Sequence, residues 1–98
     1  MIYVIATIEL KPGSLDAVRA AADAVRAETL TEDGCIAYEQ FSSLANPDRL
    51  VVVEQWATRE ALTVHSKQPH LKVWRDASGP YTLSRKIEIV HPEKVEAF

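Results

Sequence analysis

The chain has 98 residues, of which 47% are hydrophobic and 26% charged, and its formal net charge is −3. This length predicts one domain over residues 1–98, and the negative charge without any run of Lys and Arg argues against a nucleic-acid partner. No apolar run approaches the roughly 20 residues that span a bilayer. With its one cysteine, Cys35, the chain cannot form an internal disulfide. From these two features together we expect a cytoplasmic protein with no membrane partner.

The first third of the chain predicts a strand followed by a helix. Residues 2–11 are rich in β-branched and aromatic types, which favour a strand. The segment "KPGS" ends that strand and places Ser14 as a helix N-cap. From residue 15 to about residue 30 the apolar side chains recur at spacings of three and four, which is typical of an amphipathic helix.

The rest of the chain predicts a hairpin, a broken helix and a last strand. Residues 35–43 and 50–57 have strand composition, and "LANPDR" between them has the chemistry of a hairpin loop. Thr58 can cap a helix over residues 59–68. Pro69 interrupts it, so residues 69–77 are expected to form a fresh helical segment. Residues 81–90 then predict a fourth strand.

The element order β-α-β-β-α-β predicts an α+β, ferredoxin-like fold, in which helices cover one face of a four-stranded antiparallel sheet. The first and third strands should be central, because they are apolar on both faces, whereas the fourth carries several charged side chains. A sheet that is apolar on both faces leaves one face uncovered. A second copy of the chain would cover it, so we expect a homodimer with the two sheets packed face to face.

The stretch "HSKQPHLKVW" contains two of the three histidines, His65 and His70. On a continuous helix their spacing of five residues would separate the side chains by about 140°, and the H-E-x-x-H pattern of helical zinc sites is absent. Pro69 could bend the segment and bring the two imidazoles together, but a third ligand would still be missing from the local sequence. The sequence therefore predicts no metal site, and the chain has no nucleotide-binding motif that would indicate a cofactor.

His65 allows two interpretations. A neutral histidine is the natural general base near pH 7, and His65 follows Ala61 and Leu62 by about one helical turn, near the apolar side of its helix. The alternative is a boundary histidine that is hydrogen-bonded to a carbonyl group. His70 opens the next helical segment, where it could cap that segment or lie at the rim of a pocket.

Four further residues could belong to a site. Glu54 and Trp56 alternate on one face of the third strand, where Glu54 indicates a polar pocket, a salt bridge across a dimer, or a wetter end of the sheet. Trp56 could wall an aromatic ligand or belong to the core. Tyr38 and Thr7 could each supply a hydroxyl group to a substrate. Cys35 at a strand start is expected to be a free, half-buried thiol.

Residues 32–74 resemble the signature region of the antibiotic biosynthesis monooxygenase family, a branch of the dimeric α+β barrel proteins. The matching features are an acidic-x-Gly-Cys start, the hairpin "NPDR", a Glu-x-Trp strand end, the helix start "REAL", and a His followed after "QP" by a second His. The resemblance implies a ferredoxin-like homodimer. It places Trp56 at the family's pocket tryptophan, and His65 and His70 on its histidine pattern.

The resemblance also implies a reaction type, because the best-known members of the family oxidise quinols or polycyclic phenols with O₂ and use no metal or flavin. A phenol deprotonated to its anion can pass an electron to O₂, so the protein supplies a base and a dry pocket. The family's monooxygenases and haem degraders often place an asparagine beside the substrate, four residues before the tryptophan or on the first strand. Here those positions hold Val52 and Thr7, which argues against haem degradation and weakens the expectation of anthrone-type oxidation.

Three hypotheses follow from the sequence. The first is a cofactor-independent monooxygenase of a small quinol or related phenol, with His65 as base, Trp56 as pocket wall, and Tyr38 or His70 positioning the substrate. The second is an isomerase or tautomerase of a small hydroxy-carbonyl compound that uses the same base without O₂. The third is a ligand-binding or dimerisation module without catalytic activity.

Overall fold

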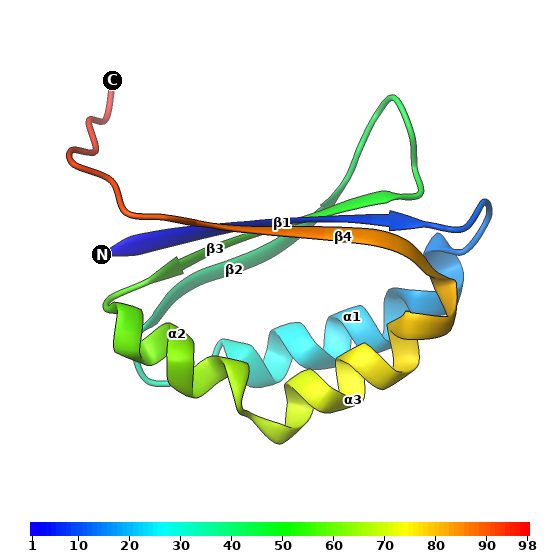
Figure 1. The fold of residues 1–98 in the computed structure, drawn as a ribbon, viewed down its shortest axis with the longest axis horizontal. Coiled ribbons are helices and arrows are strands. Elements are labelled where there is room, and N and C mark those ends of the chain that lie inside the picture. Colours follow the sequence, from blue (N-terminus) through cyan, green and yellow to red (C-terminus); the bar gives the residue numbers. More distant parts are fainter.

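The computed structural model describes residues 1–98 as a four-stranded antiparallel sheet with all helices on one side of it (Figure 1). This confirms the predicted ferredoxin-like α+β fold. The elements in chain order are β1 (Ile2–Leu10), α1 (Leu15–Thr29), β2 (Cys35–Ser42), β3 (Arg49–Trp56), α2 (Arg59–Ser66), α3 (Pro69–Ser78), a 3₁₀ turn (Gly79–Tyr81) and β4 (Thr82–Val90).

The sheet has the strand order β2-β3-β1-β4, so the first and third strands are central, as predicted. Ile2 pairs with Trp56 and Val4 with Glu54 in the register of β1 and β3. Because β2 also runs antiparallel to β3, the start of β2 lies beside the end of β3, and Cys35 pairs with Trp56. Residues that precede β2 are therefore close to residues that follow β3.

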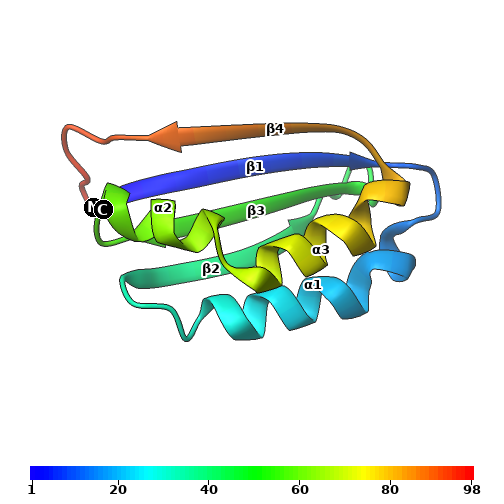
Figure 2. The same cartoon turned by 60° about the horizontal axis from the view of Figure 1, so that its bottom comes forward.

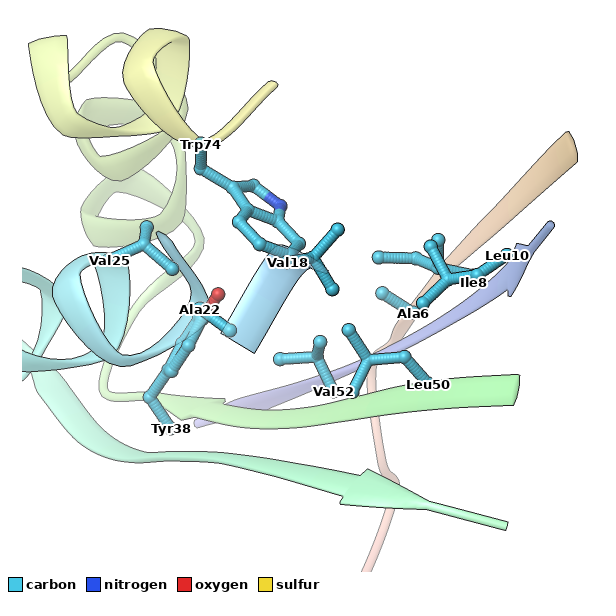
Figure 3. Close-up of a cluster of buried hydrophobic side chains, with 10 residues drawn as sticks. All are labelled: Ala6, Ile8, Leu10, Val18, Ala22, Val25, Tyr38, Leu50, Val52 and Trp74. Atoms are coloured by element: carbon cyan, nitrogen blue, oxygen red, sulfur yellow. The ribbon is translucent and has the colours of Figure 1, made fainter. Parts of the chain in front are cut away.

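The main core lies between the sheet and the helices α1 and α3 (Figure 3). In Figure 3 the indole of Trp74 on α3 points toward Val18 of α1, above the side chains of the strands. The buried members of this cluster are Ala6, Ile8, Leu10, Val18, Ala22, Val25, Tyr38, Leu50, Val52 and Trp74. A second, smaller cluster of Ile2, Val4, Trp56 and Leu62 packs α2 against the opposite end of the sheet.

The predicted break at Pro69 separates two distinct helices, α2 and α3. The hydroxyl of Thr58 caps α2 by accepting a hydrogen bond from the Ala61 backbone N–H at 3.1 Å. Pro69 occupies the first turn of α3, where its missing N–H costs nothing. Ser14 does stand at the N-cap of α1, but its side chain makes no capping hydrogen bond.

The helices leave two parts of the sheet uncovered. No helix lies in front of β4 in Figure 2, so its helix-side residues Ile87 and Ile89 are exposed. The opposite face of the sheet, which carries Ile5, Val51 and Val53, also has no helix over it (Figure 1). None of the helices is long and apolar enough to cross a membrane.

Candidate functional site

His65 lies near the end of α2 and is almost completely buried, with 4% of its surface exposed. Its Nδ1 is 2.6 Å from Oε2 of Glu32, a length typical of a strong hydrogen bond to a carboxylate. Because an ionised carboxylate oxygen can only accept, Nδ1 is the donor in this contact, and in the neutral imidazole Nε2 then carries the lone pair. The histidine is therefore held as the tautomer that a general base requires.

Glu32 is not one of the residues that the sequence singled out. This residue lies in the loop between α1 and β2. Figures 1 and 2 show that loop at the same end of the molecule as α2. Gly34 allows the close approach. It has a φ of +81°, and a Cβ at that position would lie only 2.7 Å from the Cβ of Ala61 on α2. The loop can therefore bring Glu32 against His65.

The same Glu32 oxygen also lies 2.9 Å from Nε2 of His70, in the first turn of α3. The two histidines thus meet on one carboxylate, which the helix break at Pro69 permits. The local sequence indeed lacks a third ligand, and the structure supplies a candidate from outside it, because Glu32 is remote in sequence but adjacent in space. Together Glu32, His65 and His70 place three donor atoms within 4.8 Å of one another.

Glu54 lies on the other side of His65, on β3, and only 7% of it is exposed. Its Oε1 accepts a hydrogen bond from Nε1 of Trp56 at 2.9 Å and lies 3.7 Å from Nε2 of His65. Burial raises the pKa of the Glu54 carboxyl, and the Trp56 hydrogen bond and His65 partly oppose that rise. Of the three interpretations of Glu54, the polar pocket is the one that this geometry favours.

A cavity of about 320 Å³ opens beside His65 and Glu54, between the helices and the uncovered strand β4. This is within the usual size range of small-molecule sites. Its apolar walls come from Val4, Leu62, Leu71, Ile87 and Ile89. An oxygen atom in the cavity could lie about 2.8 Å from both His65 Nε2 and Glu54 Oε1, which is hydrogen-bonding distance.

Tyr38 of β2 lines a smaller neighbouring cavity of about 80 Å³ between the sheet and α3, which shares Glu54, Leu71, Arg75 and Ile87 with the larger one. Its ring centroid is 6.0 Å from that of His65. Burial, and next the charge of Glu54, raise the pKa of the phenol, so Tyr38 stays protonated and can donate a hydrogen bond.

Three comparisons identify the fold and the family. The model of the antibiotic biosynthesis monooxygenase family matches residues 1–77. A relative from Escherichia coli K12, named "Probable quinol monooxygenase YgiN", is 32% identical, and the alignment covers 94% of this chain and 98% of that protein. Rv0793 from Mycobacterium tuberculosis, named as a monooxygenase, is 36% identical over 80% of this chain and 76% of its own length.

Solved structures agree. The structure of Rv0793 superposes with a TM-score of 0.88 and covers 98% of each chain, at 29% identity. A conserved protein from Methanosarcina mazei superposes with a TM-score of 0.89 at 27% identity, with 94% of this chain and 92% of that chain covered. The chain belongs to the antibiotic biosynthesis monooxygenase family. The resemblance inferred from residues 32–74 is thereby confirmed.

Of the two interpretations of Trp56, cavity wall or core residue, the geometry favours the core residue. The side chain is 0% exposed and packs behind the cavity, with its ring centroid 4.6 Å from that of His65. The reason is its place at the end of β3, under α2. Trp56 instead supports the two residues that do line the cavity, since its ring packs at a tilt of 41° against His65 and its indole N–H donates to Glu54.

His70 and Thr7 also lie away from the cavity. His70 contacts Glu32 on the side of His65 remote from Glu54, and it lines a separate polar pocket. Thr7 pairs with Val51 and Lys86 and belongs to the uncovered face, because only even-numbered β1 residues face the helices. The structure thus brings His65, Glu54, Trp56 and Tyr38 together, joins His70 to His65 only through Glu32, and leaves Thr7 on the opposite face. Cys35 is a free, partly buried thiol, as expected.

Replacing Glu54 by glutamine should change how the stability of this protein depends on pH. The folded-state pKa of Glu54 is raised, so above the unfolded-state pKa the unfolded chain loses a proton that the folded chain still holds. Rising pH therefore destabilises the wild type until the folded-state pKa is passed, at up to about 1.4 kcal/mol per pH unit. Glu54→Gln removes this loss and keeps an acceptor for Trp56.

Urea unfolding between mildly acidic and neutral pH checks this prediction. The stability of Glu54→Gln relative to the wild type should increase as the pH rises. The exposed, unpaired Glu60 provides a control, and Glu60→Gln should leave the pH profile unchanged. A relative stability of Glu54→Gln that falls or stays constant with pH would show that the carboxyl is ionised in the folded protein without cost.

Proposed function

We propose that this protein oxidises a small quinol or related phenol with O₂, with His65 as the general base. The observation that carries the proposal is the placement of His65 between Glu32 and the apolar cavity, with Nδ1 held by the carboxylate at 2.6 Å. A histidine in this arrangement can take a proton on Nε2 from a hydroxyl group in the cavity. The E. coli relative is named a probable quinol monooxygenase, and this name supports the same substrate class.

The chemistry balances without an added reductant. A quinol and O₂ together give a hydroxyquinone and water, so one oxygen atom enters the ring and the other leaves as water. The substrate supplies all four electrons, two from its two hydroxyl groups and two from the ring carbon that is hydroxylated. His65 accepts the hydroxyl proton, and the resulting anion is the species that donates an electron to O₂. The proton returns to the reduced oxygen.

Each side chain around the cavity has a defined part in this proposal. Glu32 fixes the His65 ring and stabilises the imidazolium that forms, in the manner of the carboxylate in a carboxylate–histidine pair. The carboxyl of Glu54 is close enough to hold the same substrate hydroxyl that His65 deprotonates. Tyr38 can donate to a second substrate oxygen from the smaller cavity, and the apolar side chains of the larger cavity would shield one side of the anion from water.

Oxygen consumption by EDTA-treated, flavin-free protein tests the proposal, with a panel of benzoquinols and naphthoquinols. We expect uptake well above autoxidation with at least one of them. We also expect one ¹⁸O atom in the hydroxyquinone when ¹⁸O₂ is supplied. No acceleration across the panel would refute the proposal. Turnover of a hydroxy-carbonyl compound without O₂ would instead support the isomerase alternative.

We further propose that the protein acts as a homodimer through the uncovered face of the sheet. This face carries apolar side chains at its centre, where Val53 of β3 pairs with Ile5 of β1. Ile5 is 39% exposed and Phe41, on the neighbouring strand β2, is 52% exposed. An exposed apolar sheet face of this kind is typical of an interface, and a second copy would bury it symmetrically.

The variant Val53→Glu should dissociate this dimer, because two buried carboxylates would face each other across the symmetric interface. Light scattering after size exclusion should give the dimer mass, about twice 10.9 kDa, for the wild type and the monomer mass for the variant. Val73→Glu is a matched control on the exposed side of α3 and should remain dimeric. A monomeric wild type, or a dimeric Val53→Glu, would exclude this interface.

A further inference from the structure

The three residues that meet at Glu32 have the composition of a transition-metal site. Two imidazole nitrogens and one carboxylate oxygen converge from three separate elements, the α1–β2 loop, α2 and α3. All three side chains are largely buried, with exposed fractions of 5% for His65, 10% for Glu32 and 17% for His70. Two histidines and one carboxylate are a recurrent ligand set for Zn²⁺ and related first-row ions.

The geometry of the cluster is close to that of a coordination sphere. The Glu32 oxygen lies 2.6 Å from His65 Nδ1 and 2.9 Å from His70 Nε2. Around one ion with bonds of about 2.0–2.2 Å, neighbouring ligand atoms are roughly 3.0–3.5 Å apart. Each of the two nitrogens therefore needs to move away from the Glu32 oxygen by less than about 1 Å to admit an ion between them.

A second observation is that hydrogen bonding does not satisfy the Glu32 carboxylate. Its Oε1 is buried and has no hydrogen-bond partner. An unpaired buried carboxylate oxygen is costly, and a bound cation would compensate its charge. The two histidine N–H groups account for Oε2 but leave this second oxygen unexplained.

An ion also has a route to the cluster that does not pass through the apolar cavity. Glu32 and His70 line an open, mostly polar pocket of about 460 Å³ whose other members include Glu28 and Asp33. Those two carboxylates attract cations to its mouth. The apolar cavity, by contrast, lies on the opposite side of the His65 ring, which forms part of its wall. The imidazole of His65 thus separates a polar approach from an apolar one.

We infer that Glu32, His65 and His70 bind a divalent first-row transition ion, for which Zn²⁺ is the probe. In the bound state His65 Nδ1 gives its lone pair to the ion, so the ring proton must move to Nε2. A histidine with N–H at Nε2 cannot accept a proton from a hydroxyl group in the cavity. A bound ion would therefore inactivate His65 as a base. This consequence rests on the proposed function, whereas the metal site does not.

Calorimetric titration of the EDTA-treated full chain with ZnSO₄ tests the site without any measurement of turnover. We expect one Zn²⁺ per chain, and an affinity at least about tenfold weaker in His70→Ala and in Glu32→Gln, because each loses one of three ligands. His91→Ala removes the remaining, exposed histidine and should bind like the wild type. Co²⁺ should give visible absorption bands in the wild type that both ligand variants lack.

Two results would overturn the inference. One is no saturable binding by a wild type that circular dichroism shows to be folded. The other is an affinity that neither ligand variant changes, which would indicate surface binding elsewhere. Neither result affects the oxygen assay, which uses metal-free protein. Conversely, a protein that binds Zn²⁺ but never consumes O₂ with any quinol would keep the metal site and lose the proposed function.

Discussion

Replacing His65 by glutamine is expected to lower quinol-dependent O₂ uptake by about 10²–10⁴-fold, the usual contribution of a general base. Glutamine can donate its amide N–H to Glu32, so the contact that fixes the side chain can survive. It has no basic lone pair to accept the substrate proton. The loss should appear in kcat more than in KM, because the proton is transferred in the transition state.

The control for this variant is His91→Gln in the exposed C-terminal tail, which should retain full activity. Raising the pH should partly restore the rate of His65→Gln, because a phenol that ionises in solution needs no base. A variant that is folded and as active as the wild type at neutral pH would exclude His65 as the base. A melting temperature measured for each variant separates loss of chemistry from loss of structure.

The second large effect is expected for Trp56→Ala, which should lower the free energy of unfolding by about 3–5 kcal/mol. Trp56 is fully buried in the smaller apolar cluster and also holds Glu54 through its indole N–H. In a domain of this size such a loss corresponds to a fall in melting temperature of at least about 12 °C. Thermal unfolding followed by circular dichroism measures it directly.

Trp56→Phe separates packing from hydrogen bonding at the same position. Phenylalanine retains an aromatic ring beside His65 but leaves the buried Glu54 oxygen without its donor, a cost of about 1–3 kcal/mol. We therefore expect a stability between that of the wild type and that of Trp56→Ala. A Trp56→Ala variant that melts within about 2 °C of the wild type would contradict the account of Trp56 as a supporting core residue.

Most of the fold could be predicted because its signals are local. Strand composition, the helical spacing of apolar residues and the cap at Thr58 each depend on a few neighbouring positions. The break at Pro69 was equally visible, since proline cannot continue a helix. The central positions of β1 and β3 followed from the apolar side chains on both of their faces. Only the Ser14 capping bond, which depends on the exact approach of one side chain, was absent.

The site could be predicted less well because its decisive contact is non-local. Glu32 lies 33 residues before His65, in a turn where an acidic residue needs no explanation. A signal was nevertheless present. Antiparallel pairing of β2 with β3 places the residues before Cys35 beside those after Trp56, and Gly34 indicated a close backbone approach. Together these features could have directed attention from His65 to the acidic turn.

The sequence left the roles of Trp56 and His70 open for a related reason. The alternation of β3 placed Trp56 on the same face as Glu54, but alternation does not distinguish a cavity wall from a fully covered core position. The angular argument about His65 and His70 assumed one continuous helix. Two helices joined at Pro69 turn both imidazoles toward the same carboxylate, which no argument from helical periodicity could predict.

The most direct test of the central claim is the protonation state of the two His65 ring nitrogens in the metal-free protein. Long-range ¹H–¹⁵N correlation spectra distinguish a protonated ring nitrogen from an unprotonated one, and His65→Gln assigns the signals. The geometry predicts a proton on Nδ1, bound to Glu32, and a free lone pair on Nε2 beside Glu54. A neutral His65 with its proton on Nε2 would contradict the assignment of this residue as the base.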